Sequence, residues 1–97
     1  MDLHQVSKAL SNPTRLNLLG ILREDPRSAA DAHRAYIREY EAKQRESIYR
    51  ELEILVEASL LSKEYNTDEK EIQYRLRHEE LVVDLANRTV GPRNGSE

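Results

Sequence analysis

The chain has 97 residues, of which 38% are hydrophobic and 34% are charged, and it carries a formal net charge of −3. A chain of this length can form one compact core but not two, so the sequence predicts a single domain. Because cysteine is absent, disulfide frameworks, thiol nucleophiles and thiolate metal sites are excluded. The sequence also lacks a long apolar stretch and the basic, then apolar, start of a signal peptide, so we expect a cytoplasmic protein with no membrane partner.

Two short helices are predicted at the start of the chain. The first covers residues 2–11, where apolar residues recur at spacings of three and four. The second begins at Pro13, which needs no backbone N–H at a first helical position, with Ser11 or Asn12 as its N-cap. Its predicted inner stripe consists of Leu16, Leu19 and Leu22.

A third and a fourth helix are predicted after Pro26. Ser28 is suited to cap the third helix, which runs to about Glu39. Residues 41–44 interrupt the apolar stripe, which favours a turn, but they are helix formers, so a nearly continuous helix is the alternative. The fourth helix covers residues 45–59. Its predicted inner face consists of Ile48, Leu52 and Leu55.

After residue 59 the spacing of apolar residues changes from every third or fourth residue, as in a helix, to every second residue, as in a strand. Residues 71–77 alternate between apolar and polar side chains, and residues 60–66 are their predicted partner in a β-hairpin. Tyr65 and Tyr74 are expected in the core. Residues 78–90 are predicted as a last helix, and residues 91–97 as a mobile polar tail. The predicted fold is therefore mainly α, with about five helices and one two-stranded β-hairpin in a domain of residues 1–90.

Two segments resemble the winged helix-turn-helix transcription regulators of the ArsR type, with some likeness to the PadR type. SKALSNPTRLNLLGIL is similar to the opening pattern of that family, and SIYRELEILVEASLLSKEYNTDEKEIQYRL is similar to its recognition helix and wing. The resemblance implies a homodimeric regulator that binds double-stranded DNA. Ser59 stands where the family usually has glycine before the first wing strand. Many members sense metals, but the lack of cysteine and the three scattered histidines predict no metal and no cofactor here.

By this resemblance, the fourth helix is the recognition helix that enters the major groove of DNA. Its exposed side is predicted to lie opposite the apolar stripe. Arginine can contact guanine and a carboxylate can accept a hydrogen bond from cytosine, so this side has the chemistry to read bases. The alternative is a solvated face on which Glu46 and Arg50 form an i, i+4 ion pair. The predicted DNA-binding residues are Lys43, Arg45, Glu46, Ser47, Tyr49, Arg50, Lys63 and Lys70.

Cations outside this helix allow two interpretations. Lys63 and Lys70 on the hairpin could touch phosphates, but Asp68 and Glu69 at its tip would repel them. Arg15 could approach a phosphate or form an ordinary ion pair with a nearby acid. The segment 27–50 is locally basic on an otherwise acidic chain, which favours docking on DNA.

A homodimer is predicted because the apolar stripes at the two ends of the chain exceed what so small a core can absorb. The predicted interface residues are Leu3, Val6, Leu10, Leu81, Val82 and Leu85. The alternative function is a winged-helix domain that contacts other proteins, which the negative net charge and the acidic hairpin tip would favour. An enzyme is not expected, because the sequence has no glycine-rich phosphate loop, no metal-spaced ligand set and no nucleophile beside a base.

Overall fold

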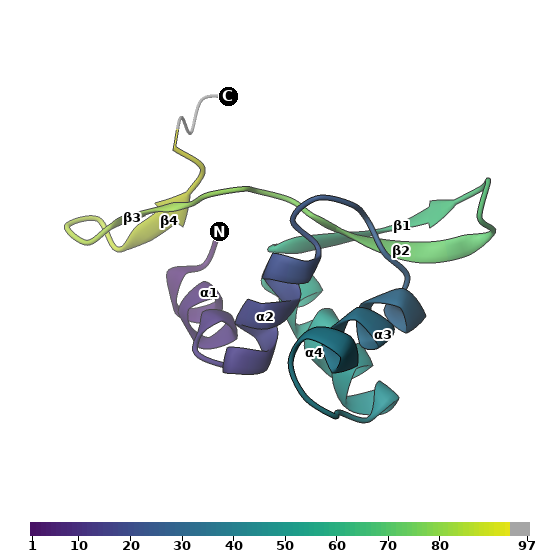
Figure 1. The fold of residues 1–97 in the computed structure, drawn as a ribbon. Coiled ribbons are helices and arrows are strands. Elements are labelled where there is room, and N and C mark those ends of the chain that lie inside the picture. Colours follow the sequence, from purple (N-terminus) through teal and green to yellow (C-terminus); the bar gives the residue numbers. More distant parts are fainter. Residues whose placement is uncertain (94–97) are drawn as a thin grey trace.

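The computed structural model of the protein describes residues 1–93. Helices α1 (Leu3–Leu10), α2 (Pro13–Ile21), α3 (Ala29–Glu39) and α4 (Arg45–Glu57) come first. Strands β1 (Leu61–Asn66) and β2 (Glu71–Leu76) form an antiparallel hairpin, here called the wing, and β3 (Val82–Asp84) and β4 (Thr89–Gly91) form a second one. Figure 1 shows the two hairpins at opposite ends of the molecule, with the helices between and below them. Residues 94–97 of the predicted tail lie outside the described part of the chain.

The first three helices begin at side-chain caps, and two of these confirm the sequence prediction. Asn12 accepts a hydrogen bond from the Arg15 N–H ahead of Pro13, and Ser28 accepts one from the Asp31 N–H. A side-chain oxygen at the cap satisfies a backbone N–H that has no partner inside the helix. Helix α4 differs, because Gln44 at its N-cap makes no such bond.

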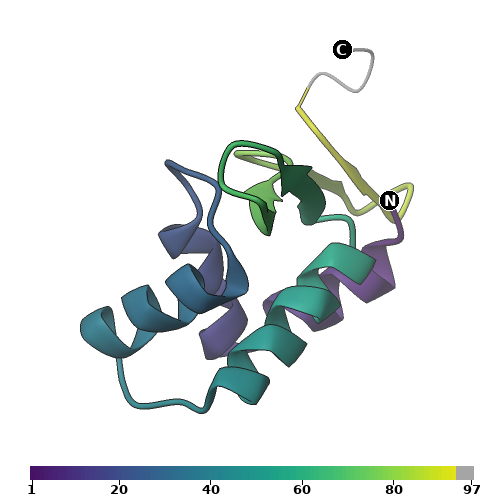
Figure 2. The ribbon, with the colours of Figure 1, turned by 90° about the vertical axis from the view of Figure 1, so that its right-hand side faces the viewer.

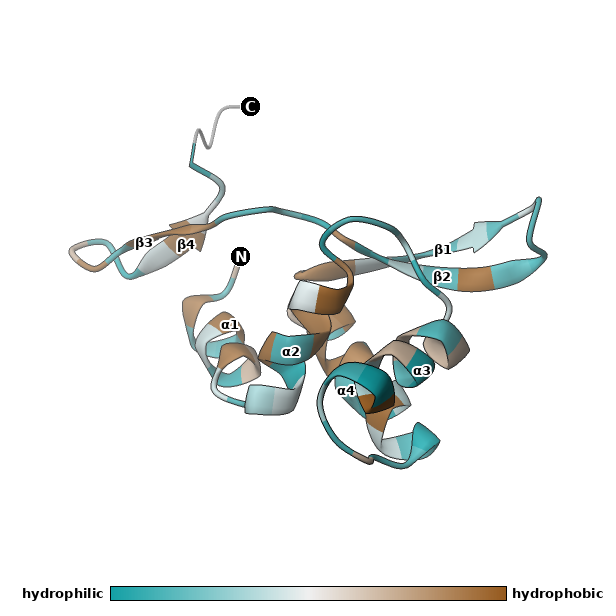
Figure 3. Cartoon of the chain, in the orientation of Figure 1, coloured by the Kyte–Doolittle hydropathy of each residue, from teal (hydrophilic) through white to brown (hydrophobic). Residues whose placement is uncertain are grey.

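The core lies where α1, α2, α3 and α4 meet below the wing. The predicted inner face of α4 is confirmed, because Ile48, Leu52 and Leu55 are fully buried. In α2 the predicted stripe is confirmed at Leu22, which is buried, and in part at Leu19, which is half-buried against the core, but it is wrong at Leu16, which is 50% exposed. Leu18 and Ile21, which were not predicted, are buried instead. The buried side of α2 is the one that faces its neighbours, since α2 packs against α1, α3 and α4. Figure 3 shows these hydrophobic stretches on the helix sides that face each other.

A turn separates α3 from α4, as predicted, and the continuous-helix alternative is wrong. α3 ends at Glu39, and residues 41–44 have no regular structure before α4 begins at Arg45. His33 on α3 donates a hydrogen bond from Nε2 to the carbonyl oxygen of Lys43, at 2.8 Å. This bond fixes the turn against α3 and so helps to set where α4 begins.

Ser59 ends α4 in the conformation that glycine adopts most easily. Its φ is 65°, in the left-handed region that side chains other than glycine rarely occupy. The Ser59 N–H bonds to the Val56 carbonyl and the Leu60 N–H to the Leu55 carbonyl, both at 3.0 Å. This pair of bonds is a Schellman motif, which satisfies the last carbonyl groups of a helix. Serine therefore takes the role of the glycine that the sequence lacks here.

The wing is attached to the helices through Tyr74. Two backbone hydrogen bonds, at 2.8 and 3.0 Å, join Tyr74 to Arg27. They form an isolated antiparallel β-bridge between the segment before α3 and strand β2. Tyr74 is buried, as predicted, but Tyr65 is 61% exposed and the prediction that it lies in the core is wrong. Tyr65 pairs across the wing with Ile72, which is also exposed, to 51%. Figure 1 shows that the outer end of the wing extends past the helices.

The predicted last helix, residues 78–90, is wrong: this segment forms β3 and β4. Asp84 accepts hydrogen bonds from the backbone and side-chain nitrogens of Asn87, and Arg88 has a φ of 56°. These two features close a four-residue turn between the strands. Four β-branched residues then occupy the strands, in agreement with the strand preference of such side chains: Val82, Val83, Thr89 and Val90.

Candidate nucleic-acid interface

One side of α4 is exposed along its first two turns. Arg45, Glu46, Tyr49 and Arg50 are exposed there, and Ser47 is half-buried. Figure 2 shows α4 across the front of the molecule with the wing above it, so both elements border one surface. The buried stripe on the opposite side of α4 fixes the rotation of the helix, which in turn decides which side chains face outward. The structure therefore brings together all five residues predicted on this helix.

Arg45 and Arg50 differ from the cations around them because they have no acidic partner within the part of the chain that the structure describes. The alternative prediction, an ion pair between Glu46 and Arg50, is not formed in residues 1–93. On α3 and the following turn, by contrast, every cation has an acidic neighbour. These pairs are Arg34 with Asp31, Arg38 with Glu39, and Lys43 with Glu41. Within residues 27–50 of the described chain, the cations left without an acidic partner are therefore Arg27 and, on α4, Arg45 and Arg50.

The two predicted lysines of the wing are in different situations. Lys63 on β1 lies against α4, where its Nζ is 2.9 Å from Oε2 of Glu53. Lys70 is exposed at the tip beside Glu69, and it has a φ of 56°. The structure therefore places Lys70 in the exposed turn at the tip of the wing and holds Lys63 in an ion pair with Glu53 of α4.

Glu53, Lys63 and Tyr74 form a cluster that joins α4 to both wing strands. Oε2 of Glu53 also accepts a hydrogen bond of 2.6 Å from the Tyr74 hydroxyl, and the Lys63 ammonium lies 6.0 Å from the centre of the Tyr74 ring. Partial burial raises the pKa of Glu53, but the bonds from Tyr74 and Lys63 outweigh it and lower that pKa overall. The bond to Glu53 raises the pKa of Lys63. Both groups therefore stay charged near neutral pH.

The sequence did not point to this cluster. Burial, followed by the bond to Glu53, raises the pKa of Tyr74, so its hydroxyl is a permanent donor. A tyrosine predicted in the core needs a polar partner for its hydroxyl. This requirement was the one feature of the sequence that indicated a buried polar contact at Tyr74. The partner itself could not be chosen from the sequence, because Glu53 is 21 positions away.

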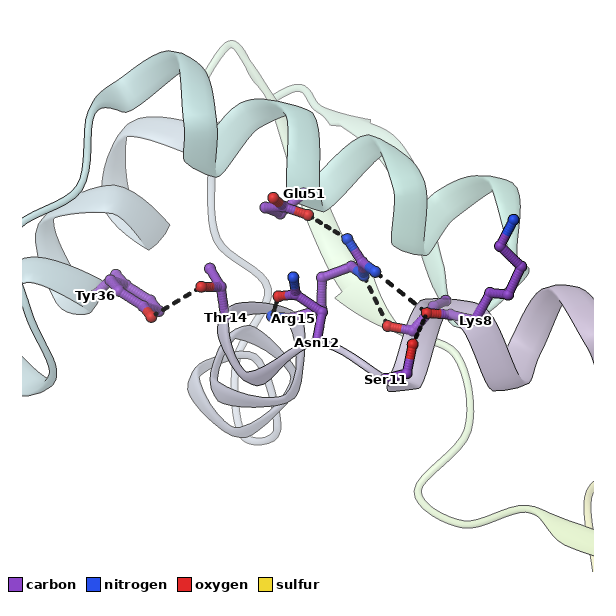
Figure 4. Close-up of polar contacts among 8 residues, drawn as sticks. Lys8, Ser11, Asn12, Thr14, Arg15, Tyr36 and Glu51 are labelled. Atoms are coloured by element: carbon purple, nitrogen blue, oxygen red, sulfur yellow. Dashed lines mark hydrogen bonds and ion pairs between the residues drawn. The ribbon is translucent and has the colours of Figure 1, made fainter.

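Arg15 is used inside the protein, which decides between its two predicted roles (Figure 4). Its Nη1 lies 2.5 Å from Oε1 of Glu51 on α4. Its Nε and Nη2 donate hydrogen bonds of 2.7 and 3.2 Å to the carbonyl oxygens of Ala9 and Lys8 at the end of α1. The two side chains are only 13% and 18% exposed. Arg15 therefore ties α1, α2 and α4 together and is not free to bind phosphate.

The residues predicted for the dimer interface are divided between the core and the surface. Val6 is buried inside the single chain. Leu3, Leu10 and Leu81 are half-buried around a pocket of about 600 Å³ between α1, α2 and the β3–β4 hairpin. Val82 and Leu85 are exposed on that hairpin, Leu85 to 81%. The hydrophobic colour at the hairpin tip in Figure 3 marks this region. All except Val6 are thus accessible on one end of the molecule.

Within residues 1–93, no three histidine, aspartate or glutamate side chains are grouped so that they could hold a metal ion. None of the helices described is long and apolar enough to pass through a membrane.

Comparison with known proteins supports the fold. No protein-family model matches the chain, and no curated protein matches it. Among solved structures, the chain is similar to the ferric uptake regulator from Pseudomonas aeruginosa, determined with manganese. The identity is 21% and the TM-score 0.61, with 94% of this chain and 73% of the other covered. At this identity the likeness shows a fold of the winged-helix kind, and the resemblance to the ArsR type stays a prediction.

Proposed function

We propose that the protein is a transcription regulator that binds double-stranded DNA, with α4 in the major groove. The observation that carries this proposal is that Arg45 and Arg50, on the exposed side of α4, form no ion pair within residues 1–93. The fold that the chain shares with a solved regulator supports it. We further propose that the protein acts in the cytoplasm as a homodimer, without enzymatic activity and without a cofactor.

The exposed side of α4 has complementary means of reading bases. A guanidinium can donate two hydrogen bonds to O6 and N7 of guanine, and the Glu46 carboxylate can accept one from N4 of cytosine. Tyr49, which is 49% exposed, offers a ring for apolar contact and a hydroxyl for a base edge or a phosphate. Because no acid in the described part of the chain holds Arg45 or Arg50, neither has to break an ion pair with these residues before it contacts DNA.

Replacing Arg50 by alanine should lower the affinity for specific DNA by about 1–3 kcal/mol, the range for a lost guanine contact, and relax the preference at one base position. The DNA ligand would first be selected from a random duplex library, and affinity would be measured by fluorescence anisotropy at several salt concentrations. Arg38→Ala is the matched control, since Arg38 is an exposed cation on α3 that already has an acidic neighbour. It should change the affinity little.

The triple variant Arg45→Ala, Tyr49→Ala, Arg50→Ala tests the helix assignment as a whole. It removes no core side chain, so its thermal unfolding should stay close to that of the unmodified protein. If the folded triple variant bound DNA unchanged, the assignment of α4 as recognition helix would be wrong. If the unmodified protein showed no salt-dependent binding to DNA, the protein-contact alternative would be favoured, given the net charge of −3 and the acidic wing tip.

Replacing Leu85 by glutamate should shift the protein from dimer towards monomer in sedimentation velocity at micromolar concentration. The reason is that a charge on the most exposed apolar residue of the β3–β4 hairpin would have to be buried between two copies. Ile37→Glu on α3, at a second exposed apolar residue, is the control and should leave the dimer intact.

The DNA half-sites of such a dimer should lie one helical turn, about 10 bp, apart or a multiple of it. A strictly monomeric unmodified protein would contradict the homodimer.

A further inference from the structure

We infer that Glu53 limits the sequence-independent affinity of this interface for DNA, because its carboxylate holds Lys63 of the wing in an ion pair and keeps that cation off the DNA phosphates. This inference rests on the proposed DNA binding. It differs from the sequence prediction that Lys63 itself contacts DNA.

The Glu53 carboxylate is held in place from the wing side. A single oxygen, Oε2, accepts from the Tyr74 hydroxyl at 2.6 Å and from the Lys63 ammonium at 2.9 Å. Tyr74 is buried and is also fixed through its backbone to Arg27, so the carboxylate has a rigid partner. The ammonium is drawn to the same oxygen and lies near the Tyr74 ring.

The ion pair is partly shielded from water. The Lys63 side chain is 35% exposed and that of Glu53 29%. Shielding makes the attraction stronger than in a fully exposed pair, which contributes little to stability. A phosphate would therefore have to compete with a positioned carboxylate for this lysine.

Charge is distributed differently on the two parts of the interface. Residues 61–77 of the wing hold four acidic and four basic side chains, and Arg75 is paired with Glu64 as Lys63 is with Glu53. On α4, Arg45 and Arg50 are unpaired in the described chain. Within the described chain, acids thus hold two of the four wing cations, Lys63 and Arg75, and neither of the two exposed arginines of α4.

Masking a wing cation has a definite effect on the affinity for DNA. Phosphate contacts supply essentially all of the non-specific affinity of a DNA-binding protein, whereas base contacts discriminate between sequences. Keeping Lys63 away from phosphate lowers the affinity for every sequence alike. The ratio of specific to non-specific affinity is set by the contacts of α4, which are left unchanged, so masking lowers the occupancy of specific and unrelated DNA together and makes binding less dependent on salt.

Glu53→Gln tests the inference directly. The glutamine oxygen can still accept from Tyr74, but it has no charge to hold Lys63. We expect the variant to bind an unrelated duplex severalfold more tightly at low salt. The slope of log affinity against log salt should become steeper by about 0.9, the value for one additional phosphate contact.

Three further variants separate masking from a general charge effect. Glu57→Gln removes the same charge from the same helix at a residue without an ion-pair partner in residues 1–93, and its salt slope should stay unchanged. Lys63→Gln alone should also leave the slope unchanged, because this lysine already has its partner. In Glu53→Gln combined with Lys63→Gln, the gain should disappear.

Each outcome decides between the possibilities. An unchanged slope in Glu53→Gln, with normal binding by the unmodified protein, would overturn masking and leave the proposed function in place. A gain that persists without Lys63 would also overturn it, since simple repulsion by Glu53 would then explain the gain. A shallower slope in Lys63→Gln alone would overturn it even if Glu53→Gln folded poorly. Failure of both the unmodified protein and Glu53→Gln to bind any duplex would overturn the proposed function together with the inference.

Discussion

Replacing Arg15 by methionine should lower the free energy of unfolding by about 3 kcal/mol, at the lower end of the range for a broken buried ion pair. The change would leave the Glu51 carboxylate largely buried without its cation. It would also remove the two hydrogen bonds that Arg15 donates to the end of α1. Urea denaturation followed by circular dichroism measures the effect.

The double variant Arg15→Met, Glu51→Leu is the control for this ion pair. Replacing both partners by apolar side chains avoids an unpaired buried charge, so most of the lost stability should return. A change within about 0.5 kcal/mol in Arg15→Met, the range of an ordinary surface substitution, would contradict the role assigned to Arg15.

Replacing Leu52 by alanine should lower the free energy of unfolding by about 2–5 kcal/mol, the range for large-to-small changes in a core. Leu52 is fully buried at the centre of the inner face of α4, and the space it leaves would be surrounded by packed helices that can close only in part. The same denaturation experiment measures the loss. Because small domains are stable by only about 5–15 kcal/mol, this loss should also lower the midpoint temperature of thermal unfolding.

Glu57→Ala is the matched control for Leu52→Ala, since Glu57 is exposed on the same helix. Its effect should stay within about 0.5 kcal/mol. Equal stabilities of the two variants would mean that α4 is not packed on the core as described, and the orientation of its exposed side would then be wrong as well.

The sequence predicted the four helices and the wing because their signals are local. Asn12 with Pro13 marks the start of α2, Ser28 that of α3, and the change of period after residue 59 marks the wing. The exposed side of α4 followed from the same periodicity, which is why its five predicted residues lie together. Tyr65 was misplaced because alternation along a strand predicts which face a residue lies on. It does not predict how far the core extends beneath that face.

The last predicted helix failed because turn chemistry was overlooked. Leu81, Val82 and Leu85 have helical spacing, but the two hairpins have turns of the same construction. At the start of each turn an Asx side chain, Asn66 or Asp84, accepts from the backbone N–H three residues later. At the end of each turn a residue has a φ of 56°, Lys70 in the wing and Arg88 in the second hairpin. The likeness between NTDEKE and DLANRT was visible in the sequence.

The pairing of charges could not be predicted. The partners Arg15 and Glu51 are 36 positions apart, and Glu53 and Lys63 come from a helix and a strand whose angle is set by the Schellman turn at Ser59. The tertiary structure, and not the local sequence, therefore decides which cations are held by acids.

The junction at Leu60 determines where the length of this chain can vary. The Leu60 N–H closes the end of α4, and its carbonyl oxygen accepts from the N–H of Arg77 just beyond β2, at 3.0 Å in both cases. One residue thus belongs to the helix end and to the base of the wing, with no linker between them. Insertions or deletions at this point would shift every hydrogen bond of the wing, whereas residues 67–70 form an exposed turn of the kind that tolerates changes in length. Relatives of this protein can therefore differ in the reach of the wing while keeping its angle to α4.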